Sequence, residues 1–222
     1  MAIKKSNGEL KGTVGPTVHF ERNGKQIMRV KTAHRTDKSQ AVFDSRNDFA
    51  VIMNLIRKFK RLIDKGFKDH KVNRSAYHSA LSVNRLNYNF AKKTTGIENL
   101  DWFQFSEGNL SNATEVSAHM TEDGKVEIVW EGTERGLTAH PDDEVVTCIF
   151  LNDSFSLYPG PEGVTRSAGR LIVDQGKPRL TGKIEAFIAF RVSNDNYRPG
   201  SDRNVSKSRW IGVVPPHPKP LY

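Results

Sequence analysis

The sequence predicts an α+β protein, in which a β-hairpin arm and a helical hairpin precede an antiparallel β-sandwich of immunoglobulin-like type. Apolar residues recur every three or four positions in the first part of the chain, which is the period of a helix face. Beyond residue 99 they alternate in short segments with no helical pattern between them. The predicted parts are an extended arm and hairpin over 1–36, a basic helical hairpin over 37–98, the sandwich over 99–214 and a proline-rich tail over 215–222.

The predicted hairpin covers residues 13–31. Val18 and Phe20 alternate with polar neighbours, and Asn23-Gly24 supplies the residue types that tolerate the positive φ angles of a tight turn. Because Gly12, Gly15 and Pro16 stand just before Val18, we expect an extended or bulged arm at these residues rather than a central strand.

Two helices are predicted next. The first runs from about residue 37 or 39 to Lys65, where Gly66 followed by Phe67 is typical of a left-handed helix cap. Asn73 can cap the second, which we expect to end near residue 87 and to be followed by a polar, irregular segment up to residue 99. Two consecutive helices with a short connection predict an antiparallel helical hairpin.

Seven later segments alternate with the period of strands, and Glu122-Asp123-Gly124-Lys125 between two of them predicts a hairpin turn. The segments are Trp102–Phe105, Glu115–Ala118, Val126–Trp130, Val145–Leu151, Arg170–Val173, Lys183–Val192 and Val205–Val213.

The composition limits the classes of function. A single cysteine, Cys148, excludes an intramolecular disulfide, and its apolar surroundings predict a buried, inert thiol. No apolar run approaches the roughly 18 residues of a membrane span, and no apolar stretch behind the basic N-terminus predicts a secretory signal. Residues 1–98 hold 21 Lys and Arg against 8 Asp and Glu, whereas residues 99–222 hold 13 against 17. We therefore expect an intracellular protein with a basic and a mildly acidic part.

Basic side chains of the helical part form the candidate contact site for a partner or for phosphates. These residues are Arg57, Lys58, Arg61, Lys65, Lys68, Lys71 and Arg74. Three interpretations stay open: contact with nucleic acid, contact with the acidic part of another copy of the chain, or a helix face that is only solvated.

The segment Ala139–Glu144, AHPDDE, matches the opening motif of zinc-dependent de-N-acetylases letter for letter. That resemblance implies that His140 and Asp143 bind the metal and that Asp142 acts as a general base. The surrounding pattern disagrees, because the motif lies between strand-like segments and the only later histidine, His217, is in the proline-rich tail. We interpret the segment as an acidic loop, and we assign no catalytic, cofactor-binding or metal-binding residue.

The chain also resembles an uncharacterised family of roughly 200-residue proteins found in gut anaerobes and their tailed phages. The resemblance rests on Gly12-Thr13-Val14-Gly15, Gly24–Arg29 (GKQIMR), Ala76–Asn84 (AYHSALSVN) and Ser206–Gly212 (SKSRWIG). These residues govern packing and turns, and the family carries no established activity.

We expect a non-enzymatic assembly subunit, in concrete form a ring component of a phage neck or tail. Its partners would be other copies of itself and neighbouring assembly proteins, in the host cytoplasm during assembly and then in the virion. One alternative is a nucleic-acid-binding accessory protein with salt-sensitive, non-specific affinity. The other is the zinc-dependent de-N-acetylase.

Overall fold

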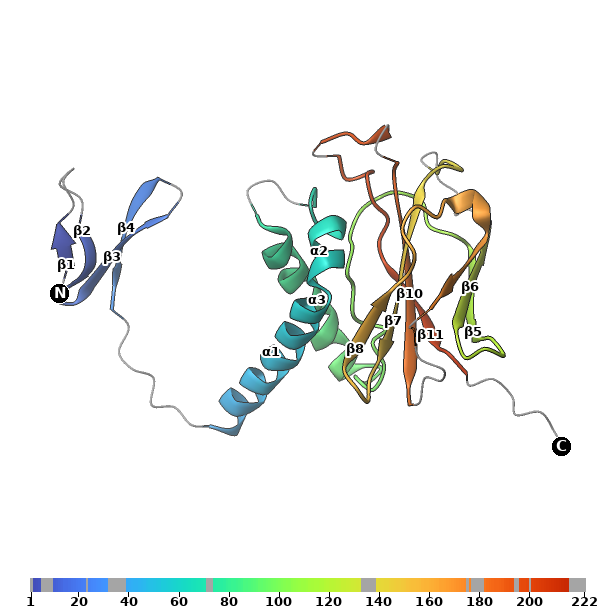
Figure 1. Cartoon of the computed structure of the whole chain (residues 1–222). Coiled ribbons are helices and arrows are strands. Elements are labelled where there is room, and N and C mark those ends of the chain that lie inside the picture. Colours follow the sequence, from blue (N-terminus) through green and yellow to red (C-terminus); the bar gives the residue numbers. More distant parts are fainter. Residues whose placement is uncertain are drawn as a thin grey trace. The chain divides into compact units, whose positions relative to one another are not determined.

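The chain forms two compact units, Met1–Arg46 and Asn47–Tyr222, which are described separately (Figure 1). The computed structural model describes residues 2–4, 10–22, 24–31, 39–70, 74–132, 139–174, 176, 182–193, 196–199 and 201–215, with only the backbone of residues 2–4 and 22. None of the helices in these ranges is long and apolar enough to cross a membrane.

The N-terminal unit contains a four-stranded antiparallel sheet in the order β1-β2-β3-β4, here called the N-terminal sheet. Its strands are β1 Ala2–Lys4, β2 Leu10–Val14, β3 Thr17–Arg22 and β4 Lys25–Val30. The predicted hairpin of β3 and β4 is confirmed, with Gly24 at a φ of 71°. The predicted extended arm is wrong, because Gly15-Pro16 forms a turn that pairs β2 with β3 and leaves β2 between two strands.

The first predicted helix forms as α1 Gln40–Lys58 and α2 Lys60–Gly66, which meet at Phe59. Its predicted apolar face is confirmed where Ile52, Ile56 and Phe59 are buried. The left-handed cap at Gly66 is wrong, since Gly66 is the last residue of α2 and is not among the glycines with positive φ. A glycine fits there for another reason, because a Cβ would lie 2.4 Å from the carbonyl oxygen of Phe105.

The second helix, α3, spans Ala76–Lys93 and is longer than predicted. Ser75 caps it by accepting a hydrogen bond from the backbone N–H of His78, whereas Asn73 lies outside the described residues. The predicted irregular segment beyond residue 87 is helical as far as Lys93, because Tyr88 and Ala91 continue the buried helix face.

Two antiparallel sheets follow the helices. The central sheet has the order β11-β10-β7-β8, and the outer sheet has the order β5-β6-β9. The central strands are β7 Glu144–Leu151, β8 Ser156–Pro159, β10 Ile184–Arg191 and β11 Arg209–Val213; the outer strands are β5 Glu115–Met120, β6 Val126–Glu131 and β9 Arg170–Val173.

Six of the predicted strand segments contain a strand, and the turn at Glu122–Lys125 joins β5 to β6 as expected. Two predictions need correction. Trp102–Phe105 is not a strand but a buried irregular segment, and the last predicted strand begins at Arg209 rather than Val205. Strand β8 had no distinct signal, because its apolar positions are few and only half-buried.

Three layers result, with the central sheet in the middle (Figure 1). One apolar cluster joins the helices to one face of the central sheet, where Phe59 contacts the rings of Phe150 and Phe187. A second cluster joins the opposite face to the outer sheet, for example Phe190 with Trp130. The helices and both sheets therefore share one compact unit across the predicted boundary at residue 98, and β7 and β10 are covered on both sides.

Candidate partner-contact surfaces

The first candidate surface, called the basic face below, comprises Arg57, Lys58 and Arg61 where α1 meets α2. All three side chains are exposed, whereas Phe59 between them is fully buried. The burial of Phe59 holds this junction against the core and directs its polar neighbours to solvent. None of the three has an ion-pair partner among the described residues.

Two of the remaining predicted contact residues have partners of their own. Lys65 Nζ lies 2.8 Å from a carboxylate oxygen of Glu162 and lowers the pKa of that carboxyl group. Lys68 lies over the ring of Tyr197, 4.8 Å from its centroid. Arg74 is exposed ahead of α3, and Lys71 lies outside the described residues. Phosphate or partner binding by all seven residues stays a prediction.

The AHPDDE segment packs its second aspartate into the protein. Asp143 is buried, accepts a hydrogen bond of 2.8 Å from the backbone N–H of His140, and lies 3.4 Å from Arg166 Nε. The guanidinium of Arg166 stacks 3.8 Å over the centroid of Phe190 and donates to the carbonyl oxygen of Ser111. Asp143 thus ties the start of β7 to the short 3-10 helix Arg166–Ala168.

This geometry gives the zinc hypothesis no support. His140 and Asp142 are exposed and lie 3.4 Å apart, but the carboxylate of Asp143 faces Arg166 instead of joining them. Across the described ranges, no group of three or more His, Cys, Asp and Glu side chains could hold a metal ion. His217 lies outside these ranges.

Asp143→Asn should lower the free energy of unfolding by about 2 kcal/mol, because it removes the negative charge that faces the buried guanidinium of Arg166. Denaturant unfolding measures this change. His140→Ala is the matched control, because that side chain is exposed and should cost little. Equal losses in the two variants would contradict the structural role of Asp143.

Cys148 is the only other group with nucleophilic chemistry that the sequence singled out. It is fully buried in the cluster between the helices and the central sheet. Burial raises the pKa of the thiol, so the thiolate that would act as nucleophile is suppressed.

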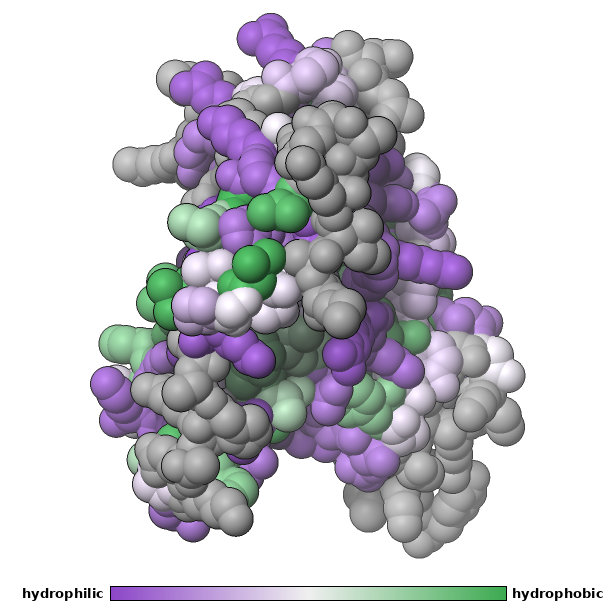
Figure 2. All heavy atoms as spheres, turned by 90° about the vertical axis from the view of Figure 1, so that its left-hand side faces the viewer, coloured by the Kyte–Doolittle hydropathy of each residue, from purple (hydrophilic) through white to green (hydrophobic). Residues whose placement is uncertain are grey.

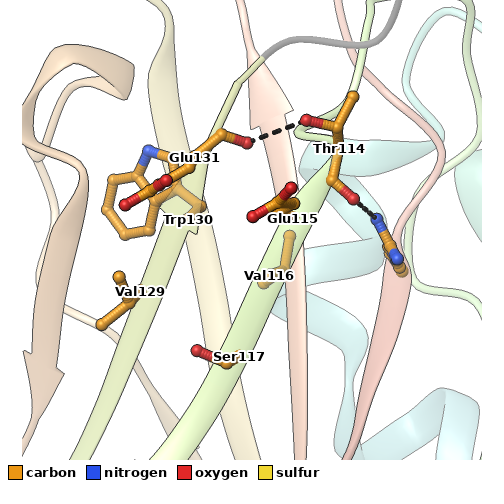
Figure 3. A pocket seen from close by; sticks show the side chains of 8 residues that line it. Thr114, Glu115, Val116, Ser117, Val129, Trp130 and Glu131 are labelled. Atoms are coloured by element: carbon orange, nitrogen blue, oxygen red, sulfur yellow. Dashed lines mark hydrogen bonds between the residues drawn. The ribbon is translucent and has the colours of Figure 1, made fainter.

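The second candidate surface, called the acidic face below, lies on the outer sheet around Glu115 and Glu131. These residues are directly opposite each other on β5 and β6, and both are exposed. They line a hollow of about 440 Å³ together with Thr114, Ser117 and Arg209 among others (Figure 3). Two like charges in register on neighbouring strands repel each other. The acidic face therefore favours a cationic neighbour.

Among the described residues, Arg209 forms no salt bridge with Glu115 or Glu131. Its guanidinium donates hydrogen bonds of 3.0 and 3.1 Å to the carbonyl oxygens of Ala113 and Thr114. Glu115 and Glu131 were not predicted as site residues, although the sequence contains the signal. Counting outward from the predicted turn at Glu122–Lys125 places the two glutamates opposite each other.

Exposed apolar side chains form a third feature of the surface, and Figure 2 shows apolar side chains among hydrophilic ones on the face it displays. In α3, Leu86 and Phe90 are 69% and 68% exposed. In the N-terminal sheet, Met28 and Val30 are 66% and 71% exposed. Contiguous exposed apolar residues are typical of contact surfaces.

Comparisons with known proteins identify the family alone. A family model described as a family of unknown function, DUF6266, matches residues 8–212. A comparison with curated proteins gave no significant match, and neither did one with solved structures. The predicted resemblance to an uncharacterised family is confirmed, whereas its occurrence in gut anaerobes and phages stays a prediction. Since the match spans most of the sequence, the chain belongs to the DUF6266 family of unknown function.

Proposed function

We propose that the chain is a non-enzymatic structural subunit that assembles with copies of itself, and that its N-terminal sheet is a contact arm. The observation that carries the proposal is the burial pattern of this sheet. None of its described side chains is buried, although four strands are paired in it. Its apolar residues therefore form no core of their own.

A sheet of this kind gains little free energy from burial. Small sheets need an apolar face that packs against another element, and units near forty residues commonly depend on partners for stability. Met28 and Val30 alternate with Arg29 along β4, so both lie on the same face of the sheet. Contact with another copy would remove these side chains from water at about 25 cal/mol per Å² of apolar surface.

The concrete form that we propose is a ring, such as a component of a phage neck or tail, made in the host cytoplasm and carried in the virion. Neighbouring assembly proteins would be its other partners. The resemblance noted in the sequence supports the phage setting. We also propose an immunoglobulin-like arrangement of the two packed sheets, which is supported by four strands in one and three in the other.

Val30→Lys should weaken self-association about tenfold or more, because it places a charge in an apolar contact. The measurement is the molar mass in solution across protein concentration, by sedimentation or light scattering. Gln26→Lys is the matched control, since it adds the same charge to an exposed polar position on the same face. A wild-type chain that stays monomeric at every concentration would overturn the proposed function.

A nucleic-acid-binding role is the second candidate, and the exposed basic face favours it. In that case, affinity for DNA would fall steeply with salt, because bound lysines and arginines release counterions. A DNA titration at two salt concentrations tests this role. A monomer whose DNA affinity falls on Arg57→Gln and Arg61→Gln would replace the assembly proposal with this one.

A further inference from the structure

The basic face and the acidic face lie on opposite sides of the three-layer unit. The helices pack on one face of the central sheet, and the outer sheet packs on the other. Arg57 of α1 and Arg61 of α2 are exposed, and these two helices belong to the helical layer (Figure 1). Glu115 and Glu131 alternate with the inward-facing Val116 and Trp130, so they point away from the central sheet.

Among the described residues, neither face is joined to an opposite charge by an ion pair. Other lysines of the helices have acidic partners: Lys60 pairs with Asp64, Lys65 with Glu162 and Lys92 with Asp48. On the outer sheet, Glu127 has cationic neighbours in His119 and Arg170. By contrast, the three cations of the basic face and the two glutamates of the acidic face have no ion pair among the described residues.

The acidic face can also receive a neighbour sterically. β5 is the edge strand of the outer sheet, and the hollow of about 440 Å³ lies along it. Ile172 on β9 is 47% exposed and contributes apolar surface to the same sheet face. Long basic side chains bring apolar stems as well as charge, so they suit a face of this mixed character.

We propose that the basic face of one copy docks on the acidic face of the next copy. This inference rests on the proposed assembly function. It names the two surfaces of Asn47–Tyr222 through which neighbouring copies of the chain meet. Because the two faces are different patches on opposite sides of the unit, the contact is heterologous. In a pair joined this way, one copy keeps an unused acidic face and the other an unused basic face. Repetition of the contact builds a ring if the rotation between neighbouring copies brings the last copy back to the first.

Charge reversal tests the pairing. One variant carries Arg57→Glu with Arg61→Glu, and the other carries Glu115→Lys with Glu131→Lys. Each should self-associate at least about tenfold more weakly than the wild type, because its two faces have charges of the same sign. A one-to-one mixture should assemble again, since every face then meets its complement on the other variant. Molar mass in solution measures both effects.

Controls separate this inference from the proposed function. Arg85→Glu with Lys93→Glu makes the same change in net charge at exposed positions of α3 and should leave assembly unchanged. If the wild type assembles and both reversed variants assemble equally well, the pairing is wrong while the assembly function stands. Loss of assembly without rescue in the mixture also overturns the pairing. A wild type that never assembles would overturn both the pairing of the two faces and the proposed assembly function.

Discussion

Glu185→Ala should lower the free energy of unfolding by about 3–5 kcal/mol, because three donors lose one charged acceptor and each unsatisfied buried group costs about 1–3 kcal/mol. Glu185 lies on β10 and is fully buried. Its carboxylate accepts hydrogen bonds from the backbone N–H of Leu100 at 2.7 Å, Asn152 Nδ2 at 2.6 Å and Trp210 Nε1 at 2.8 Å. Alanine would leave these donors without their acceptor, and each unpaired buried donor carries a desolvation cost.

Urea unfolding followed by circular dichroism measures this loss. Glu185→Gln keeps one oxygen acceptor in the same place, so its free energy of unfolding should lie between those of the wild type and Glu185→Ala. Glu162→Ala removes an exposed glutamate whose ion pair with Lys65 is at the surface, where solvent screens it, so the change in stability should be small. A Glu185→Ala variant as stable as Glu162→Ala would show that this network contributes little.

Gly66→Ala is expected to destabilise the protein by about 3 kcal/mol through overpacking. The added Cβ would lie 2.4 Å from the carbonyl oxygen of Phe105 and 2.5 Å from the Cβ of Ser106. The Phe105 oxygen belongs to the backbone of a buried segment, so no side-chain rotation relieves that contact. The end of α2 must therefore move away from residues 105–106. Thermal unfolding, read as the change in midpoint, measures the effect.

Asp64→Ala, two residues earlier in the same helix, is the appropriate comparison. Its side chain is exposed and, among the described residues, forms its ion pair with Lys60 one turn away, so alanine there should change stability little. If both alanine variants unfold at the same temperature, the close approach at Gly66 does not constrain the fold.

Local features of the fold could be predicted where a pattern and a turn agree. The helix spacing through Ile52 and Ile56, the alternation in β6 and the turn at Glu122–Lys125 all form as expected. Gly66 shows the limit of such patterns. A glycine before an aromatic residue is typical of a helix cap. Here a glycine is needed because the backbone of Phe105, about forty residues further along the chain, packs against it, and no local pattern encodes that contact.

Long-range partners explain what the sequence could not give at the candidate surfaces. Arg57, Lys58 and Arg61 were predicted to share one polar helix face with Lys65, because helical spacing decides which residues share a face. Their exposure is shown only by the structure. The pairing of Lys65 with Glu162 and the hydrogen bonds of Glu185 depend on residues far away in the chain. The Glu115–Glu131 pair was within reach of prediction, because hairpin register follows from the turn.

Cys148 gives the molecule a built-in reporter. Because the only thiol is enclosed between the helices and the central sheet, a water-soluble alkylating reagent reaches it only while that layer is open. The rate of modification therefore follows the equilibrium between closed and open states of the helical layer. Alkylation that slows as copies assemble would show that assembly holds the helices on the sheet, and each subunit would then be locked by its neighbours.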